Sequence, residues 1–417
     1  MIKYREYRTA EALTEYLLTV SGVDSVRIGE LCEVTCGNNG SEIQNATVVA
    51  IDGRSATLRL YKGAQSLNSG NIRVRFTGRA PTVTVSENLL GRRLDGFGEV
   101  ADNGPRLICG KRAEIYSPPM SPAEKTCPTE MLMTGLSAVD VFSPILKGQK
   151  LALLSGYGIP YEDLLLRLTA QYGKNASNPI IIYAGVGMTA RASEALDCAV
   201  SDMGIIDRTV RIVSTADAPL PERLATPHTA MTVAEYFATE CGACVIVLLS
   251  DVAAYAEAHR ASAIDAGEAM ASNGYPVTLY PDLAAIVERA GVYKRGRGSV
   301  TLIAATVSDA STPITEALRR TTDGRITLST VLYKNGVYPP IDPRHSFSAL
   351  RKNAKNTPVS EHRTEALLAR YAEAISGKGT QISFAQSLLD ALVSQDMRTF
   401  RSSACISDTV EKLLTSQ

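Results

Sequence analysis

Residues 149–169 read QKLALLSGYGIPYEDLLLRLT, and this stretch decides which fold the chain can adopt. An apolar run is followed by a turn built on Gly156 and Gly158, and then by leucines at helical spacing. A strand, a glycine turn and a helix in this order are typical of a phosphate-binding loop, in which backbone N–H groups and the helix N-terminus hold phosphate oxygens. The stretch therefore predicts an α/β domain with a loop of this kind.

The loop lacks the residues that nucleotide chemistry requires. When the pattern GxxxxGK[ST] is laid on it, Tyr161 replaces the lysine and Glu162 replaces the hydroxyl that holds Mg²⁺. Pro160 removes a backbone N–H donor, and Glu162 and Asp163 place carboxylates at the helix N-terminus, where a phosphate would bind. We therefore predict a degenerate nucleotide loop without a catalytic residue, made of Ser155, Gly156, Gly158, Pro160, Tyr161 and Glu162.

Length and charge limit the possible partners. With 417 residues the chain is long enough for more than one folding unit, and 43 basic residues balance 43 acidic ones. This balance gives no electrostatic reason to expect a nucleic acid or an anionic membrane as the main partner. No apolar run approaches the roughly 20 residues that span a bilayer, and the N-terminus is charged where a signal peptide is apolar. We expect a soluble, cytoplasmic protein.

The eight cysteines are too few for a disulfide scaffold in a chain of this length. Cys241 and Cys244 form a CxxC, which could be a redox pair or half of a zinc site. No second CxxC or HxxxH accompanies the pair, and it leads directly into the apolar run VIVLL. We therefore interpret these cysteines as ordinary small core residues, and we predict no metal site.

The chain divides into three expected parts. Residues 1–75 hold short alternating runs with turn signals between them, which predict an N-terminal β-barrel. Residues 76–345 begin with an irregular, Pro- and Gly-rich stretch to about 140 and then alternate apolar strands with helices, which predicts a RecA-like parallel sheet with helices on both faces. Residues 346–417 read as a helical domain. The expected strands of the barrel are 29–36, 44–52, 55–61 and 71–78, and the expected helices are 162–173, 189–203, about 227–240, 252–272, 361–376, 383–394 and 406–416.

A barrel, a nucleotide-type sheet and a helical bundle in this order resemble the rotary ATPase alpha/beta family. The stretch SAVDVFSPILKGQKLALLSGYGIP at 137–160 resembles the loop of the V-type (archaeal or vacuolar) B subunit, which reads close to SGSGLP where other members have GKT. Four further segments match the B pattern in order, and the resemblance covers nearly the whole chain: ERLATPHTAMTVAEY at 222–236, VIVLLSDVAAYAEAHR at 245–260, GYP at 274–276 with LYPDLAAIVERAG at 279–291, and LYKNGVYPPID at 332–342.

The resemblance implies a function without catalysis at the chain's own loop. B subunits alternate with catalytic A subunits in a hexameric ring and couple ATP turnover to rotation and to H⁺ or Na⁺ transport. We therefore expect no cofactor of its own, and ATP or ADP with Mg²⁺ at the interface with an A subunit. The expected partners are that subunit and the central and peripheral stalks. The chain would meet the membrane only through the complex, and the transported ion and the direction, synthesis or hydrolysis, stay open.

The sequence departs from the family where a B subunit acts on its neighbour. Family members follow PPID with a stretch resembling xxPSLSRL, whose arginine reaches into the A site, and the ungapped match here is PRHSFSALRK at 343–352. The arginine position is Ala349. An arginine finger is worth about 10³–10⁵ in rate, or roughly 4–7 kcal/mol. Arg351 or Arg344 could substitute, and Arg351 is favoured because Pro343 restricts the backbone before Arg344.

Three other positions are candidates for the subunit interface. Asp251 ends an apolar strand as a Walker B carboxylate does, although capping of the next helix is the favoured interpretation. Glu222 and Arg223 match a family ER pair, and a solvated helix start explains them equally well. The alternative to a working B subunit is a divergent paralogue that serves as a structural or assembly module. A P-loop enzyme or hexameric helicase is disfavoured because the loop lacks Lys and Ser/Thr.

Overall fold

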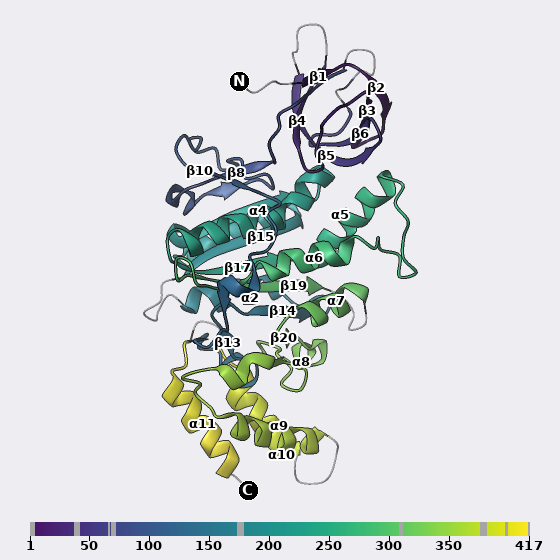
Figure 1. Cartoon of the computed structure of the whole chain (residues 1–417). Coiled ribbons are helices and arrows are strands. Elements are labelled where there is room, and N and C mark those ends of the chain that lie inside the picture. The colour runs from purple at the N-terminus through teal and green to yellow at the C-terminus, as the bar shows by residue number, and fades with distance from the viewer. Residues whose placement is uncertain are drawn as a thin grey trace.

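The computed structural model of the chain describes residues 5–36, 42–65, 67, 72–172, 179–307, 312–375, 382–396 and 399–415. A curled sheet, a central α/β unit and a group of helices follow one another along the long axis of the molecule, so that the two termini lie at opposite ends (Figure 1). This order is the one that the sequence predicts. The exact boundaries at 75 and 345 stay predictions.

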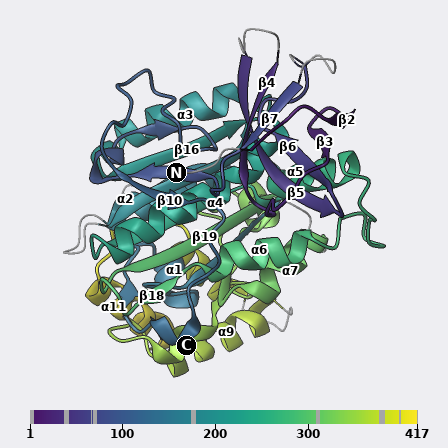
Figure 2. The same ribbon diagram turned by 45° about the horizontal axis from the view of Figure 1, so that its top comes forward.

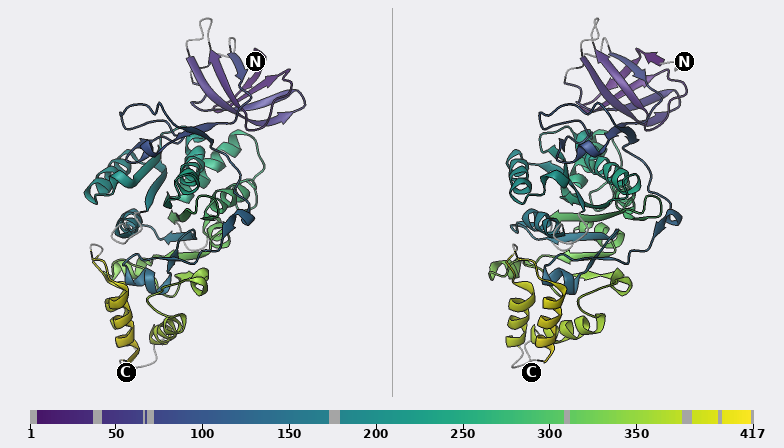
Figure 3. Two further views of the ribbon diagram at one scale, coloured as in Figure 1. Left: turned by 60° about the vertical axis from the view of Figure 1, so that its left-hand side comes forward. Right: turned by 90° about the vertical axis from the view of Figure 1, so that its left-hand side faces the viewer.

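The N-terminal part is a seven-stranded antiparallel sheet with the order β1-β7-β4-β5-β6-β3-β2. Alternate side chains of β4, such as Cys32 and Val34, point into its core, as strand periodicity requires. The sheet curls (Figure 3), but its edge strands β1 and β2 are not paired with each other in the described residues. The strands are β1 (Arg5–Tyr7), β2 (Ala10–Leu13), β3 (Leu17–Ser21), β4 (Leu31–Cys36), β5 (Glu42–Asp52), β6 (Ser55–Leu60) and β7 (Ile72–Phe76).

The central sheet has ten strands, and its main path is β21-β20-β14-β19-β17-β15-β16-β9. Neighbours from β20 to β9 are parallel, and the antiparallel strand β18 (Gly291–Tyr293) joins β19 and β11 (Lys125–Thr126). Parallel strands are covered on both faces, which explains their continuous apolar sequences. The strands are β9 (Arg93–Leu94), β14 (Lys150–Ser155), β15 (Ile180–Met188), β16 (Thr209–Thr215), β17 (Cys244–Ser250), β19 (Ser299–Val307), β20 (Gly324–Thr327) and β21 (Phe347–Ser348).

The two faces of this sheet bury different cores. In β14, Leu151 and Leu153 join one hydrophobic cluster, while Ala152 and Leu154 join the other. Helices α4 (Leu220–Thr239), α5 (Val252–Asp265), α6 (Leu279–Glu288) and α7 (Pro313–Thr321) pack on the second cluster, and α4 to α6 lie together beside the strands in Figure 2. The first cluster holds α1 (Ser137–Phe142), α2 (Tyr161–Tyr172) and α3 (Ala190–Asp202), and it continues into the C-terminal helices.

The C-terminal helices are α9 (Glu361–Ile375), α10 (Ile382–Leu388), which continues as a π-helical turn (Leu389–Val393), and α11 (Ser403–Thr415). The Arg370 side chain ties them together, because it donates hydrogen bonds to the carbonyls of Leu413 and Leu414 and lies over the Phe384 ring. The short helix α8 (Thr330–Lys334) precedes them. Residues 71, 173, 376 and 416, which the sequence analysis adds to neighbouring elements, lie outside the described residues. No helix in the described part of the chain is long and apolar enough to cross a membrane.

Three expectations about the elements are wrong. The helix expected over 252–272 ends at Asp265, where a turn at 266–267 follows it. The stretch 76–140, expected to be irregular, contains short strands whose partners are distant in sequence, so local periodicity could not reveal them. Helix α4 starts at Leu220 rather than near 227, because prolines are tolerated in a first helical turn and Pro227 lies inside the helix without ending it. The short elements of this stretch are β8 (Thr82–Val85), η2 (Glu87–Leu89), β9, β10 (Lys111–Glu114), η3 (Pro122–Glu124), β11 (Lys125–Thr126) and β12 (Met131–Leu132), which pairs with β13 (Ile145–Leu146).

Candidate functional site

The degenerate loop lies between β14 and α2, at the carboxyl edge of the parallel strands. Gly158 has a φ of +82°, a conformation that favours glycine. A Cβ added at Gly156 would lie 2.4 Å from the Thr330 methyl group, so the chain passes close to α8 there. The backbone of the loop thus keeps the tight glycine turn that the sequence predicts.

Side chains of the protein fill the space beneath this turn. Tyr161, at the lysine position of a nucleotide loop, is 8% exposed and belongs to the main hydrophobic cluster together with Ile159. Its hydroxyl lies 3.4 Å from the Ser250 hydroxyl at the end of β17. The Ser155 hydroxyl donates a hydrogen bond to the Gly156 carbonyl. The position that would carry a phosphate-binding cation therefore contributes to packing instead.

Two carboxylates occupy the first turn of α2, and only one of them has a cationic partner. Asp163 accepts a hydrogen bond from Arg167 Nε at 2.8 Å. Within the described residues Glu162 has no cationic partner; burial raises its pKa, and the nearby charge of Asp251 raises it further. No group of three or more possible metal-ligating side chains occurs among the described residues. The helix N-terminus is thus already supplied with negative charge.

Asp251 caps a helix, as the favoured interpretation of the sequence has it. As the N-cap of α5, its carboxylate accepts a hydrogen bond from the Ala253 N–H at 3.1 Å, although its φ of 57° is left-handed, which is unusual for an N-cap. Burial raises the pKa of Asp251, although hydrogen bonds from Ala254, Ala253 and Val307 oppose this shift. Its role at a subunit interface stays a prediction.

Glu222 and Arg223 lie in the first turn of α4 and are half-buried rather than solvated. Glu222 Oε1 accepts a hydrogen bond from the Gly96 N–H at 3.3 Å. Burial raises the pKa of Glu222, and the nearby Asp95 raises it further. Arg223 Nε is buried and makes no hydrogen bond within the described residues. The two residues do lie at a helix start, but they are half-buried rather than fully solvated, and the interface role stays a prediction.

Near Ala349, the two arginines that could replace the missing one differ in where their side chains lie. Ala349 is exposed and begins the 3₁₀ helix η5 (Ala349–Asn353). Arg351 points into the protein, where its guanidinium donates hydrogen bonds to the carbonyls of Val141 and Val359 and to the Thr364 hydroxyl. Arg344 is exposed, and within the described residues its backbone N–H donates to the Asp342 carboxylate while its guanidinium makes no hydrogen bond. The structure therefore argues against the preference for Arg351.

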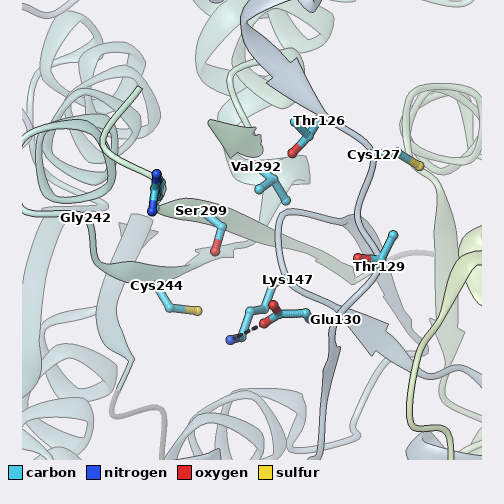
Figure 4. A pocket seen from close by; sticks show the side chains of 11 residues that line it. Thr126, Cys127, Thr129, Glu130, Lys147, Gly242, Cys244, Val292 and Ser299 are labelled. Carbon is cyan, nitrogen blue, oxygen red and sulfur yellow. Dashed lines mark hydrogen bonds and ion pairs between the residues drawn. The ribbon is translucent and has the colours of Figure 1, made fainter. Parts of the chain in front are cut away.

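The expectation that Cys241 and Cys244 are core residues is wrong for Cys241 only, because Cys244 packs against the first hydrophobic cluster. Cys241 is exposed and Cys244 is half-buried, and both thiols are free. Cys244 lines a cavity of about 340 Å³ that Cys127 also lines. Figure 4 shows the Lys147–Glu130 ion pair, 2.7 Å between Nζ and Oε2, near Cys244, with Cys127 on the other side of the view. The turn before β17 is at the surface, which the apolar run after it could not reveal.

A cluster of buried and half-buried titratable groups on three helices was not predicted from the sequence. Asp282 on α6 has an oxygen 3.4 Å from His228 Nε2 on α4 and another 3.6 Å from His259 Nε2 on α5. Tyr255 donates a hydrogen bond to the same carboxylate. Burial would raise the pKa of Asp282, but its contacts with His228 and Tyr255 outweigh burial and lower it. Because the three helices meet only in the fold, no sequence spacing connects these residues.

The strand order and the glycine turn between β14 and α2 define a nucleotide-binding type of α/β protein. Comparison with known proteins agrees: residues 135–348, just over half of the chain, match the model of the ATP synthase alpha/beta family, nucleotide-binding domain. The chain belongs to this family. Members of the family form hetero-oligomeric rings in rotary ATPases.

Proposed function

We propose that the chain is the non-catalytic, regulatory B subunit of a V-type H⁺- or Na⁺-translocating ATPase or ATP synthase. In this proposal it alternates with catalytic A subunits in a ring and couples their ATP turnover to rotation and ion transport. It works at the cytoplasmic side of the membrane, and it binds ATP or ADP with Mg²⁺ only at the interface with the A subunit.

The filled nucleotide loop carries this proposal. A catalytic member of the family needs a cation for the phosphates and a hydroxyl for Mg²⁺. Here Tyr161 is packed in the core in place of the cation, and Glu162 is a carboxylate in place of the hydroxyl. A triphosphate would bring several negative charges against Glu162 and Asp251 without a compensating lysine. A family member that cannot use its own loop contributes to turnover through its neighbour.

The substituted arginine supports an alternative, in which the chain is a paralogue that acts as a structural or assembly module. Ala349 cannot stabilise phosphoryl charge, and Arg351 would have to break three hydrogen bonds to reach a neighbour. If the subunit works, Arg344 is the better substitute, because its side chain is exposed on the same segment.

Co-expression with an A-type partner that has an intact GKT loop tests the proposal. Native mass spectrometry is expected to show rings with equal numbers of both chains, because a ring of this chain alone would contain no competent nucleotide site. A stable homo-hexamer that does not take up the A-type chain would contradict the proposal and favour the paralogue.

A further inference from the structure

A cavity of about 660 Å³ lies at the junction of the N-terminal sheet and the two-stranded ribbon of β8 and β10. One part of its lining consists of two loops of the N-terminal sheet, 27–30 and 77–80. The other part is on the ribbon, where Arg112 and Glu114 of β10 are two residues apart and so lie on one face of the strand. The ribbon lies just below the curled sheet in Figure 1. The cavity is therefore formed where two parts of the fold meet.

Three arginines line this cavity without a carboxylate partner. Arg27 and Arg79 come from the two loops and Arg112 from β10, and all three are exposed. Within the described residues their hydrogen bonds run through backbone groups only, and none of the three guanidinium groups makes a hydrogen bond or an ion pair. The charges of the whole chain balance, so these three groups around one cavity are a local excess of positive charge.

The carboxylates in the same lining offset this excess only in part. Glu33 pairs with Arg75, with 3.5 Å between Oε2 and Nη1. Glu30 is 8% exposed, and both of its oxygens accept hydrogen bonds from backbone N–H groups. Glu114 is exposed and has no partner for its carboxylate within the described residues. Three unpaired guanidinium groups thus stand against one unpaired carboxylate, which favours a ligand with at least two negative charges.

Glu30 fixes the two loops that carry Arg27 and Arg79. Its Oε2 accepts a hydrogen bond from the Arg27 N–H at 3.1 Å, and its Oε1 accepts one from the Gly78 N–H at 2.7 Å. The Leu31 N–H also donates to the Arg79 carbonyl at 2.7 Å. The backbone at both arginines is therefore held in place before a ligand binds, and this lowers the entropy that binding costs.

Ile28 indicates that the ligand also has an apolar group. It lies in the same loop as Arg27, lines the cavity and is 69% exposed. A large aliphatic side chain gains free energy when another apolar group covers it from water. A free phosphate would pair with the guanidinium groups but would leave Ile28 in water. A protein segment can supply carboxylates and an aliphatic side chain together, so it fits this lining better.

We propose that this cavity binds an acidic segment of a partner protein, with at least two carboxylates and one aliphatic side chain. Its carboxylates accept hydrogen bonds from the guanidinium groups of Arg27, Arg79 and Arg112, and its aliphatic side chain covers Ile28. The bound segment joins the N-terminal sheet to the ribbon. None of these residues belongs to the nucleotide loop or to the segment around Ala349, so the site is independent of the function proposed above.

Fluorescence anisotropy of a labelled EELEE peptide with the full chain at low salt tests the site. We expect saturable binding that weakens at least about tenfold in Arg27→Gln/Arg79→Gln, because two charged contacts are lost. The matched control is Arg191→Gln/Arg363→Gln, which removes the same charge at exposed positions on α3 and α9 outside the cavity. It is expected to leave the affinity unchanged. A QQLQQ peptide is expected to show no saturable binding.

A second variant tests the apolar contact with the arginines in place. Ile28→Ser is expected to weaken binding of the EELEE peptide at least about threefold, because its aliphatic side chain is lost. Circular dichroism and the melting temperature check that each variant stays folded. The proposal is overturned if the wild-type chain shows no saturable binding of the peptide, or if Arg27→Gln/Arg79→Gln binds it as tightly as the control does.

Competition with pyrophosphate distinguishes a protein segment from a phosphate group. We expect pyrophosphate to displace the peptide only weakly, because it cannot cover Ile28. If pyrophosphate binds more tightly than the peptide and Ile28→Ser binds the peptide as the wild type does, the cavity is a phosphate site and the acidic segment is the wrong occupant.

Discussion

Tyr161 shows how one residue changes the role of a loop, because its ring is packed where a nucleotide-binding protein extends a lysine. We expect Tyr161→Ala to lower the free energy of unfolding by about 3–5 kcal/mol, the usual cost of removing a buried aromatic side chain. The control is Tyr157→Ala in the same loop, because Tyr157 is 68% exposed. It is expected to change stability by less than about 0.5 kcal/mol. Urea denaturation measures both, and equal effects would contradict the packing role.

Whether another arginine replaces the missing arginine finger can also be tested at single residues. In a reconstituted ring, Arg344→Ala is expected to lower ATP turnover at least about tenfold without changing assembly, if Arg344 replaces the missing finger. Arg351→Ala is expected to lower the melting temperature of the isolated chain, because three hydrogen bonds are lost. Ala349→Arg should partly restore turnover in the Arg344→Ala ring. Brisk turnover in Arg344→Ala would mean that the A subunit supplies the charge itself.

For single residues, the sequence shows which residue type occupies a functional position, but it does not show which way the side chain points. The substitutions in the loop and at Ala349 are readable from spacing alone. That Arg351 points inward depends on Val141 and Thr364, which lie 210 and 13 residues away in the chain.

Among the elements, α4 and α6 are joined by the buried Arg289–Glu235 ion pair. Arg289 is 1% exposed and also donates hydrogen bonds to the Ile115 and His228 carbonyls. We expect Arg289→Ala to cost about 3–5 kcal/mol, because it leaves the Glu235 charge without its partner. Arg320→Ala, which breaks an exposed pair on α7, is expected to cost less than about 0.5 kcal/mol.

Chemical denaturation with urea measures these two costs. The double variant Arg289→Met/Glu235→Leu is expected to recover most of the lost stability, since removing both charges avoids a buried unpaired one. A double variant as unstable as Arg289→Ala would show that the neutral contacts of Arg289, and not the ion pair, hold these helices.

The Asp282 cluster makes the contact of α4, α5 and α6 sensitive to pH. Burial lowers the pKa of His259, although the Asp282 carboxylate opposes this shift. The unfolded chain therefore binds a proton that the folded chain resists, so this stability is present above about pH 6.5 and is lost as the pH falls. The nearby charges of Asp282, Arg59 and Glu268 are the same in a His259→Gln variant.

We expect the free energy of unfolding to fall less steeply in His259→Gln than in the wild type between about pH 7.5 and 5.5. Burial also raises the pKa of Asp140 to about 7, but this group is common to both proteins and cancels in the comparison. Urea titrations at several pH values give the two slopes. Identical slopes would show that His259 titrates as it does in the unfolded chain.

The elements were predictable where their own sequence carries the pattern. The strands β4, β6 and β7 bury every second side chain, and the central strand β14 is buried almost continuously; the sequence displays the first pattern as alternation and the second as an unbroken apolar run. The strands within 76–140 were not predictable, because β9 has two residues and its partner β16 lies more than a hundred residues away. The predicted start of α4 near Pro227 was wrong, because tertiary packing outweighs the cost of a proline inside the helix.

For the whole molecule, the order of a curled sheet, a nucleotide-type domain and C-terminal helices places the filled loop in the middle part, away from both termini (Figure 1). The fold was therefore predictable from the sequence, since each part has its own periodicity and composition. The partner could not be predicted, because nothing in one chain of a ring determines which residues its neighbour supplies. Family membership gives the kind of assembly, and the loop gives the role proposed within it.

The central claim is that this chain has the family's loop without a nucleotide site of its own. Calorimetric titration of the purified chain with Mg-ATP tests this claim most directly. The account predicts binding no tighter than about millimolar and no hydrolysis, because the loop has no lysine, no metal hydroxyl and a carboxylate pair at the helix start. A micromolar affinity that requires Mg²⁺, and that a bulky side chain at Gly156 or Gly158 abolishes, would contradict it.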